Sequence, residues 1–298
     1  MNRRKPHVTT SLLARRAQAL RRYLPAAIRG DHHGVHQARV ATRRLREAVP
    51  VLTTGIKGAK TKKARVKIRR LTRALGTVRE LDVTLHVLDE LARRPGIPRN
   101  ALEDVRAHVM LERDDRRALM LERLDEVNAE KLGRRLRAVG AVLSESGVEK
   151  WREVLAVRIV KRARRFSAAV QEAGLIYSPE RLHQVRIAAK KLRYALELAQ
   201  ELSGSRATAR VRTLKQAQDL LGRMNDLEVL IARIRAVQGS SEAASLRLSA
   251  DLDRLVRRLE TECRQLHGQY MASRRKLLAI CDYVAAAGAP DGAAISAA

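Results

Sequence analysis

The chain has 298 residues, of which 45% are hydrophobic, so it can bury a hydrophobic core in one or two domains. Lys and Arg number 61 against 32 Asp and Glu, and the formal net charge of +29 is typical of a protein that binds a polyanion. Aromatic residues make up only 2%, which argues against a single-strand nucleic-acid binder with an aromatic stacking platform. The two cysteines are too far apart in sequence for a redox or zinc pair, and no stretch approaches the ~20 apolar residues of a membrane span. The beginning of the chain lacks the apolar run of a signal peptide, so we expect a cytoplasmic protein.

Apolar residues recur at helical spacing along the chain, and no segment alternates apolar and polar residues in the way that a strand requires. The pattern therefore predicts an all-α protein. Eight helices are expected, and they run approximately over residues 9–28, 34–52, 59–94, 101–144, 149–173, 179–202, 206–238 and 242–283. The fourth of these is very long for a globular protein, and we expect it to bend near Gly133.

One motif occurs twice, in the second and the sixth of these helices, which we call the signature helices. It reads His-Gln-Ala-Arg-Val-Ala-Thr-Arg-Arg-Leu-Arg at residues 36–46 and His-Gln-Val-Arg-Ile-Ala-Ala-Lys-Lys-Leu-Arg at residues 183–193. In each copy the His, the first Arg, the next Arg or Lys and the last Arg lie within ~80° of each other on a helix, and apolar residues take the opposite side. Like charges at this spacing repel each other. A stripe of cations without carboxylates therefore suggests that an anion completes the structure.

A second motif also occurs twice, at Leu75–Val83 and Leu221–Val229, and its copies are separated by about the same number of residues as those of the first motif. The matched spacing indicates an internal duplication. We expect two pseudo-symmetric four-helix units, over about residues 8–145 and 149–285, packed into one compact domain over residues 8–285. The two signature helices would then face one shared basic cleft or channel. Residues 1–7 and 286–298 are expected to be flexible ends.

On these two motif pairs the chain resembles the CHAD domain, the conserved histidine α-helical domain. The resemblance covers residues 8–285, nearly the whole chain, and two motif pairs at matched spacing make it specific. It implies an all-helical, pseudo-symmetric fold with a basic central channel that binds inorganic polyphosphate.

Polyphosphate offers repeated oxygens and no bases, so the matching receptor is a rigid row of guanidinium and ammonium groups. We expect phosphate contacts from the motif cations and imidazoles of both signature helices, namely His36, Arg39, Arg43, Arg44, Arg46, His183, Arg186, Lys190, Lys191 and Arg193. A second set is expected on the neighbouring helices, namely Lys63, Lys67, Arg70 and Lys215. The alternative for the histidines is a capping or packing role, and the alternative for the cation stripes is a solvated surface.

Three functions are compatible with the sequence. The first is a non-catalytic module that binds polyphosphate, in the cytoplasm or at polyphosphate granules. The second is a general nucleic-acid binder, which the net charge favours and the lack of aromatic residues opposes. The third is an enzyme that works through a phosphohistidine or that processes polyphosphate, but the stripes contain no P-loop and no metal-holding carboxylates.

A possible metal site at Asp82, His86 and Glu90 has helical spacing, but the second half offers no equivalent ligands. We therefore expect no metal, no cofactor, no catalytic residue and no membrane contact.

Overall fold

The computed structural model describes residues 8–56, 59–125, 129–146, 150–204, 208–240 and 246–287. Within these residues the protein is all-α, with nine helices and no strands. The helices are α1 (Val8–Ile28), α2 (His32–Leu52), α3 (Ala59–Ala92), α4 (Arg99–Asp125), α5 (Ala129–Ser146), α6 (Trp151–Ala173), α7 (Pro179–Ser203), α8 (Thr208–Ser240) and α9 (Leu246–Ala287). The signature helices are therefore α2 and α7. The predicted flexible ends lie outside the described residues, except that α9 extends to Ala287.

The predicted fourth helix is two helices in the structure. The first ends at Asp125 and the second begins at Ala129, whereas Gly133, where a bend was expected, lies inside α5. The two pieces have different packing partners, since α4 packs against α3, α8 and α9 while α5 packs against α1 and α3. One straight helix could not reach all of these surfaces. A helical glycine costs only about 1 kcal/mol relative to alanine, so Gly133 alone does not force a break.

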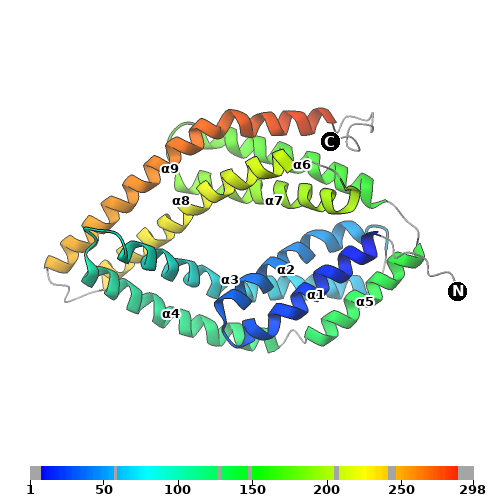
Figure 1. Ribbon diagram of the computed structural model, residues 1–298, viewed down its shortest axis with the longest axis horizontal. Helices are drawn as coiled ribbons and strands as arrows, with labels where there is room; N and C mark the ends of the chain where they lie inside the picture. Colours follow the sequence, from blue (N-terminus) through cyan, green and yellow to red (C-terminus); the bar gives the residue numbers. More distant parts are fainter. Residues whose placement is uncertain are drawn as a thin grey trace.

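The buried apolar residues form two clusters. The larger cluster takes residues from α1, α2, α5, α6 and α7 and from parts of α3, α4, α8 and α9. The smaller one takes residues from the C-terminal parts of α3 and α8, from the N-terminal parts of α4 and α9, and Ile97 from the connection between α3 and α4. In Figure 1 these four helix ends meet at the left of the molecule. There they join the helix group α1–α5 to the helix group α6–α9, which are called the two halves below. On the right, α1, α2 and α5 lie below and α6, α7 and the end of α9 lie above.

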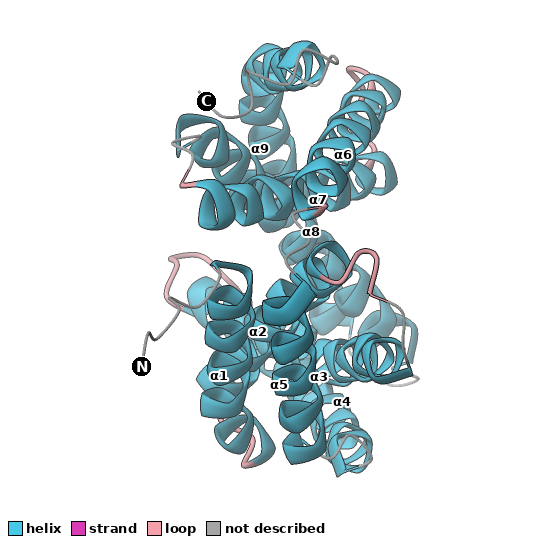
Figure 2. Ribbon diagram, turned by 90° about the vertical axis from the view of Figure 1, so that its right-hand side faces the viewer, coloured by secondary structure: helices cyan, strands magenta, loops and turns pink. Residues whose placement is uncertain are grey.

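The order of helix contacts is the same in the two halves. In the first half α1 packs against α2, α2 against α3 and α3 against α4. In the second half α6 packs against α7, α7 against α8 and α8 against α9, and α9 returns to α6 as α5 does to α1. Figure 2 shows the two helix groups one above the other. This repeated order is what a duplication would produce, while the division near residues 145 and 149 stays a prediction.

A second junction between the halves lies at the end opposite the smaller cluster. Here α1 and α2 contact α6 and α7. Arg16 of α1 is almost fully buried, and its guanidinium donates to the carbonyl of Arg44 at 2.7 Å and to the carboxylate of Glu201 in α7 at 2.9 Å. The two halves are thus joined at both ends, which leaves space between them in the middle.

Candidate anion-binding site

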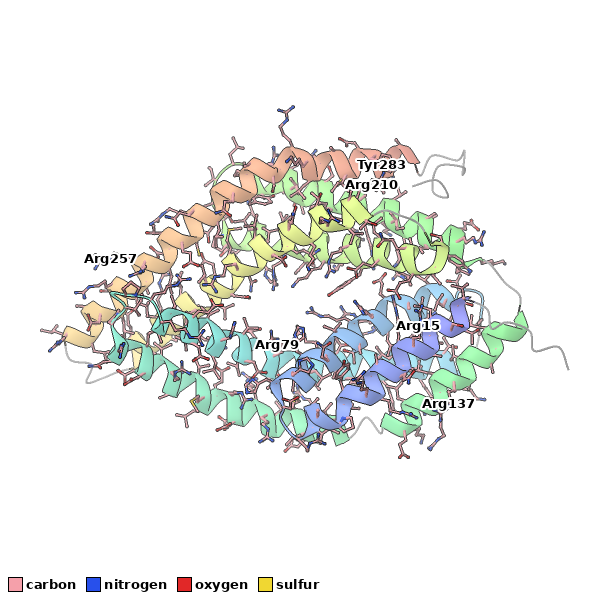
Figure 3. All side chains as sticks on the ribbon, viewed as in Figure 1. Arg15, Arg79, Arg137, Arg210, Arg257 and Tyr283 are labelled. Atoms are coloured by element: carbon pink, nitrogen blue, oxygen red, sulfur yellow. The ribbon has the colours of Figure 1, made fainter. Side chains whose placement is uncertain are left out.

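A cavity of about 900 Å³ lies between the halves, lined by α2 and α3 on one side and by α6, α7 and α8 on the other. Its charged lining is predominantly cationic. Ten lining residues are Arg or Lys, namely Arg39, Arg43, Arg46, Arg69, Arg79, Arg158, Arg162, Arg186, Lys190 and Lys191. His36 and His183 also line it, against only three carboxylates, those of Glu47, Glu80 and Asp226. In Figure 3, Arg79 lies on the α3 side of the gap between the halves, whereas Arg137 and Arg257 project from the outside of the molecule.

The local sequence of α2 explains why its cations face the cavity. Asp31 caps the helix, since its side chain accepts a hydrogen bond from the backbone N–H of Gly34 at 2.7 Å. From there the apolar positions, including Ala38 and Leu45, are fully buried. That burial sets the rotation of the helix about its axis, and the opposite stripe of His36, Arg39, Arg43 and Arg46 lines the cavity.

The second signature helix repeats this arrangement up to its third turn. Ser178 caps α7 by accepting from the N–H of Arg181, and Pro179 occupies the first turn. Val185 and Leu192 are fully buried. The cavity is then lined by four of the predicted residues of this helix, namely His183, Arg186, Lys190 and Lys191.

Two of the ten predicted motif residues lie outside the cavity. Arg44 is exposed, and it contributes its carbonyl to the contact with Arg16. Arg193 turns toward α8, where its guanidinium donates to Gln218 at 3.0 Å, and it pairs with Glu197 one turn further along α7. Neither residue lines the cavity in this structure, and their expected phosphate contacts stay a prediction. In the first copy Arg46 faces the cavity, because the residue one turn further is Pro50 and offers no carboxylate.

The second predicted set also lies outside the cavity. Lys63, Arg70 and Lys215 are exposed, and Lys67 does not line the cavity either. The cavity is lined by Arg69 of α3. About the helix axis, the angle from Arg69 is about 100–160° for Lys63, Lys67 and Arg70. In place of that set, α3 contributes Arg69 and Arg79, and α6 contributes Arg158 and Arg162.

The second repeated motif could have revealed part of this missing set. Gly76, Arg79 and Val83 are spaced at i, i+3 and i+7, so they share one face of α3. Asn225 and Val229 are the equivalents of Arg79 and Val83 in α8, and all four line the cavity. The motif therefore marks the side of α3 and α8 that faces α2 and α7.

The glycines of this motif give room to the first arginine of each stripe. Arg39 donates through Nη1 to the carbonyl of Gly76 at 2.9 Å, and a Cβ at position 76 would stand 3.3 Å from that nitrogen. In the second half the corresponding distance, from a Cβ at Gly222 to Nε of Arg186, would be 3.9 Å. A Cβ at position 76 would therefore require the Arg39 guanidinium to shift by a small amount, whereas at position 222 it would make an ordinary contact.

Burial and the repulsion of neighbouring cations lower the pKa values of several groups in the cavity, among them Lys190, Arg39 and His36. The pKa of Lys190 is lowered to about 7, first by burial and then by Arg186, Arg43 and Arg39. Burial, with Arg43 and Arg79, lowers the pKa of Arg39 to about 10. The pKa of His36 is lowered by burial and then by Arg79. A bound anion would reverse each of these shifts.

The carboxylates of the cavity neutralise only part of this charge. Glu47 pairs with Arg162 at 2.6 Å and with Arg158 at 3.5 Å, and Asp226 lies 3.9 Å from Arg186. Glu80 lies 3.9 Å from Arg233 of α8, which is outside the cavity. Among the described residues, no carboxylate forms an ion pair with seven of the ten cavity cations, namely Arg39, Arg43, Arg46, Arg69, Arg79, Lys190 and Lys191. An anion bound beside these cations would gain the most favourable electrostatic interaction, because no carboxylate already neutralises them.

The three candidate metal ligands do not form a group that could hold a metal ion. Asp82 is buried and pairs with Arg113 at 2.8 Å and with His32 at 3.0 Å, while His86 pairs with Glu90 at 3.3 Å. Within the described ranges, no three His, Cys, Asp or Glu side chains are grouped in a way that could hold a metal ion. No helix of the described residues is long and apolar enough to cross a membrane.

Comparison with known proteins points to one family. The family model of the CHAD domain matches residues 11–235. The crystal structure of the CHAD domain from the plant Ricinus communis is similar, with a TM-score of 0.56 and 23% identity, over 95% of this chain and 91% of that one. PptA from Streptomyces chartreusis is similar with a TM-score of 0.59 and 16% identity, over 95% of this chain and 99% of that one. At these identities the two structures share the fold with this chain. No curated protein sequence matches it.

Proposed function

Because this chain belongs to the CHAD domain family, we propose that its cavity binds inorganic polyphosphate. CHAD domains are linked to polyphosphate. The observation that carries the proposal is the imbalance of the lining, with ten Arg and Lys against three carboxylates. Burying these cations and bringing them together costs free energy in the ligand-free protein, as the pKa of Lys190 reflects, which is lowered first by burial and then by neighbouring arginines. A polyanion in the cavity recovers that free energy.

The chemistry of the lining suits a phosphate chain better than a base-bearing one. Arginine forks bind phosphate oxygens with two parallel hydrogen bonds, and part of the gain comes from released counterions. Tyr194 is the aromatic residue of the lining, and the Arg193 guanidinium lies over its ring at 4.7 Å from the centroid. A nucleic-acid base would therefore find little aromatic surface on which to stack.

General nucleic-acid binding is the competing function. The net charge of +29 and exposed cations outside the cavity, such as Lys63 and Lys215, support it. Duplex nucleic acid would bind these outer cations and would not need the cavity. Competition between the two polyanions therefore separates the two proposals.

We propose that binding is not accompanied by catalysis, and that the protein serves to hold or to recruit polyphosphate, including at polyphosphate granules. Each carboxylate of the lining lies beside an arginine, as Glu47 does beside Arg162, which suits it to orienting cations. A phosphohistidine on His36 or His183 is the main alternative. Labelled polyphosphate that leaves acid-labile phosphate on the protein, or releases orthophosphate, would contradict a purely binding role.

The test is the affinity for long-chain polyphosphate in moderate salt, for wild type and for Arg43→Glu with Lys190→Glu, with duplex DNA as competitor. We expect the pair to abolish binding, and we expect DNA at equal phosphate not to displace polyphosphate from wild type. The matched control is Lys63→Glu with Lys215→Glu, which changes the net charge equally on exposed residues outside the cavity. The proposal would be contradicted if both pairs lost the same affinity for polyphosphate, or if DNA competed as well as polyphosphate. The cavity would then be one part of a nonspecific cationic surface.

A further inference from the structure

One carboxylate follows directly after the cationic stripe of the first signature helix. Glu47 lies one turn beyond Arg43, it lines the cavity, and only 9% of its surface is exposed. The second copy has Tyr194 at the equivalent position, so the repeat does not require an acid here. A buried carboxylate in a site that attracts anions needs a reason of its own.

The partners of Glu47 are two arginines of α6 that also line the cavity. Arg162 approaches it with both terminal nitrogens, Nη1 at 2.6 Å from Oε1 and Nη2 at 2.9 Å from Oε2. Arg158 Nε lies 3.5 Å from Oε1. Arg162 is held further by the carbonyl of Lys191, to which it donates at 2.7 Å. Of these contacts only that of Nη2 with Oε2 is a hydrogen bond, and the buried Glu47 Oε1 accepts none among the described residues. Glu47 is therefore held by charge and by one hydrogen bond, and arginine can offer a phosphate group two.

We propose that Arg158 and Arg162 form a phosphate subsite that the Glu47 carboxylate occupies in the empty protein, and that a polyphosphate chain enters this subsite only by displacing Glu47. The inference rests on the proposed function, and it divides the cavity into two parts. The part around Arg43 and Lys190 is open to phosphate at once. The part along α6 is filled by the protein's own anion.

The displacement has an energetic consequence. A phosphate group that replaces Glu47 gains the contacts to Arg158 and Arg162 but must break those that the carboxylate already makes. The resident carboxylate therefore lowers the affinity of the subsite, and removing its charge should raise it. Glu47 also links α2 to α6, so the same change removes an ion pair between the two halves.

A purely structural cross-link predicts the opposite behaviour. If Glu47 only joined α2 to α6, its loss would lower stability and leave the affinity for polyphosphate equal or weaker. The proposal expects lower stability together with tighter binding. Opposite signs in two measurements on one variant separate these possibilities.

The experiment measures the affinity of long-chain polyphosphate and the thermal stability of the ligand-free protein for wild type and Glu47→Gln. We expect the affinity of Glu47→Gln to rise about tenfold, the change expected for one added charge-assisted contact. The matched control is Glu201→Gln, which also removes an ion pair between the halves, that of Arg16, but at a residue outside the cavity. This control should lose stability without gaining affinity.

A second variant excludes a simple effect of net charge and serves if the single variant does not fold. Glu47→Gln with Arg158→Gln removes one negative and one positive charge together, so the local net charge equals that of wild type. We still expect affinity severalfold above wild type, because Arg162 is freed. Affinity at or below that of wild type in the Glu47 variants would overturn the inference and leave the proposed function intact. Failure of wild type to bind polyphosphate would overturn both.

Discussion

The two signature helices, α2 and α7, start from nearly the same sequence, yet their last turns have different partners. Arg46 of α2 lines the cavity, while its equivalent Arg193 pairs with Glu197 and Gln218. One residue further, Glu47 and Tyr194 both line the cavity, but Glu47 also pairs with two arginines of α6. The difference shows that the repeat determines the first three turns of each stripe, and that the residue one turn beyond decides where the last cation goes.

The histidines that begin the two stripes differ for a similar reason. His183 Nδ1 donates to the side-chain oxygen of Asn225 at 2.6 Å. The residue equivalent to Asn225 in the first half is Arg79, which together with burial lowers the pKa of His36. The first half therefore places a cation where the second half places a neutral partner, and the first half gains more from an anion beside its histidine.

Between the halves, the largest difference in the loss of polyphosphate affinity on substitution is expected at the equivalent residues Arg43 and Lys190. At pH 8, Arg43→Gln should lower the affinity for polyphosphate about tenfold, as expected for the loss of one charge-assisted contact. Lys190→Gln should cost less, because with a pKa of about 7 the lysine must first take up a proton at that pH. The two losses should become equal near pH 6. Titrations of both variants at the two pH values check this, and equal losses at pH 8 would contradict the placement of Lys190 among the arginines.

The second prediction concerns the pH dependence of wild type. A bound polyanion returns the pKa of Lys190 from about 7 toward the 10.5 of an ordinary lysine, so binding takes up a proton between these values. Affinity should therefore fall as pH rises above 7, by up to about tenfold per pH unit. Lys190→Arg should flatten this dependence, whereas Lys191→Arg, on an exposed neighbour, should keep it. A slope that persists in Lys190→Arg would assign the proton to another group.

A smaller difference in polyphosphate affinity is expected between variants of Arg46 and of its equivalent Arg193. Arg46→Gln should weaken polyphosphate binding about fivefold, since a cation in contact with phosphate is lost. Arg193→Gln should leave affinity unchanged and lower stability, because it breaks the contacts with Glu197 and Gln218. Calorimetric binding and thermal unfolding of the two variants separate these effects. A loss of affinity in Arg193→Gln as large as that in Arg46→Gln would mean that Arg193 turns into the cavity when ligand is bound.

The smallest difference is expected at the two motif glycines. Gly222→Ala should raise the free energy of unfolding by about 0.5–1 kcal/mol, since alanine favours the helix and its Cβ finds ordinary contacts. Gly76→Ala should raise the free energy of unfolding by less, because its Cβ would stand only 3.3 Å from Nη1 of Arg39. The shifted guanidinium should weaken polyphosphate binding about threefold, since its charge-assisted contact with phosphate is weakened. Chemical denaturation with parallel binding curves tests this pair. Identical behaviour of the two variants would show that Arg39 adjusts without loss.

The sequence by itself determined the all-α class, the two motif pairs and the faces of α2 and α7 that carry cations. Helical periodicity relates residues of one helix to each other, so the burial of Leu45 and Leu192 was enough to place Arg43 and Lys190 on the opposite side. Eight of the ten motif residues expected at the site line the cavity for this reason. The repeated glycine motif also carried information, since its spacing places Arg79 and Val83 on one face of α3, and the tertiary structure shows that this face lines the cavity.

Only the tertiary structure decided which side of α3 and α6 faces the other half. The buried stripe of α3, which includes Leu71 and Leu75, has cations on both flanks, with Arg69 on one and Lys63 on the other. Periodicity alone does not distinguish these flanks, because it gives no information on the position of a partner helix. The contacts of Arg158 and Arg162 with Glu47, and the break between α4 and α5, likewise depend on residues far apart in sequence. Such long-range pairings are set by how the two halves close on each other.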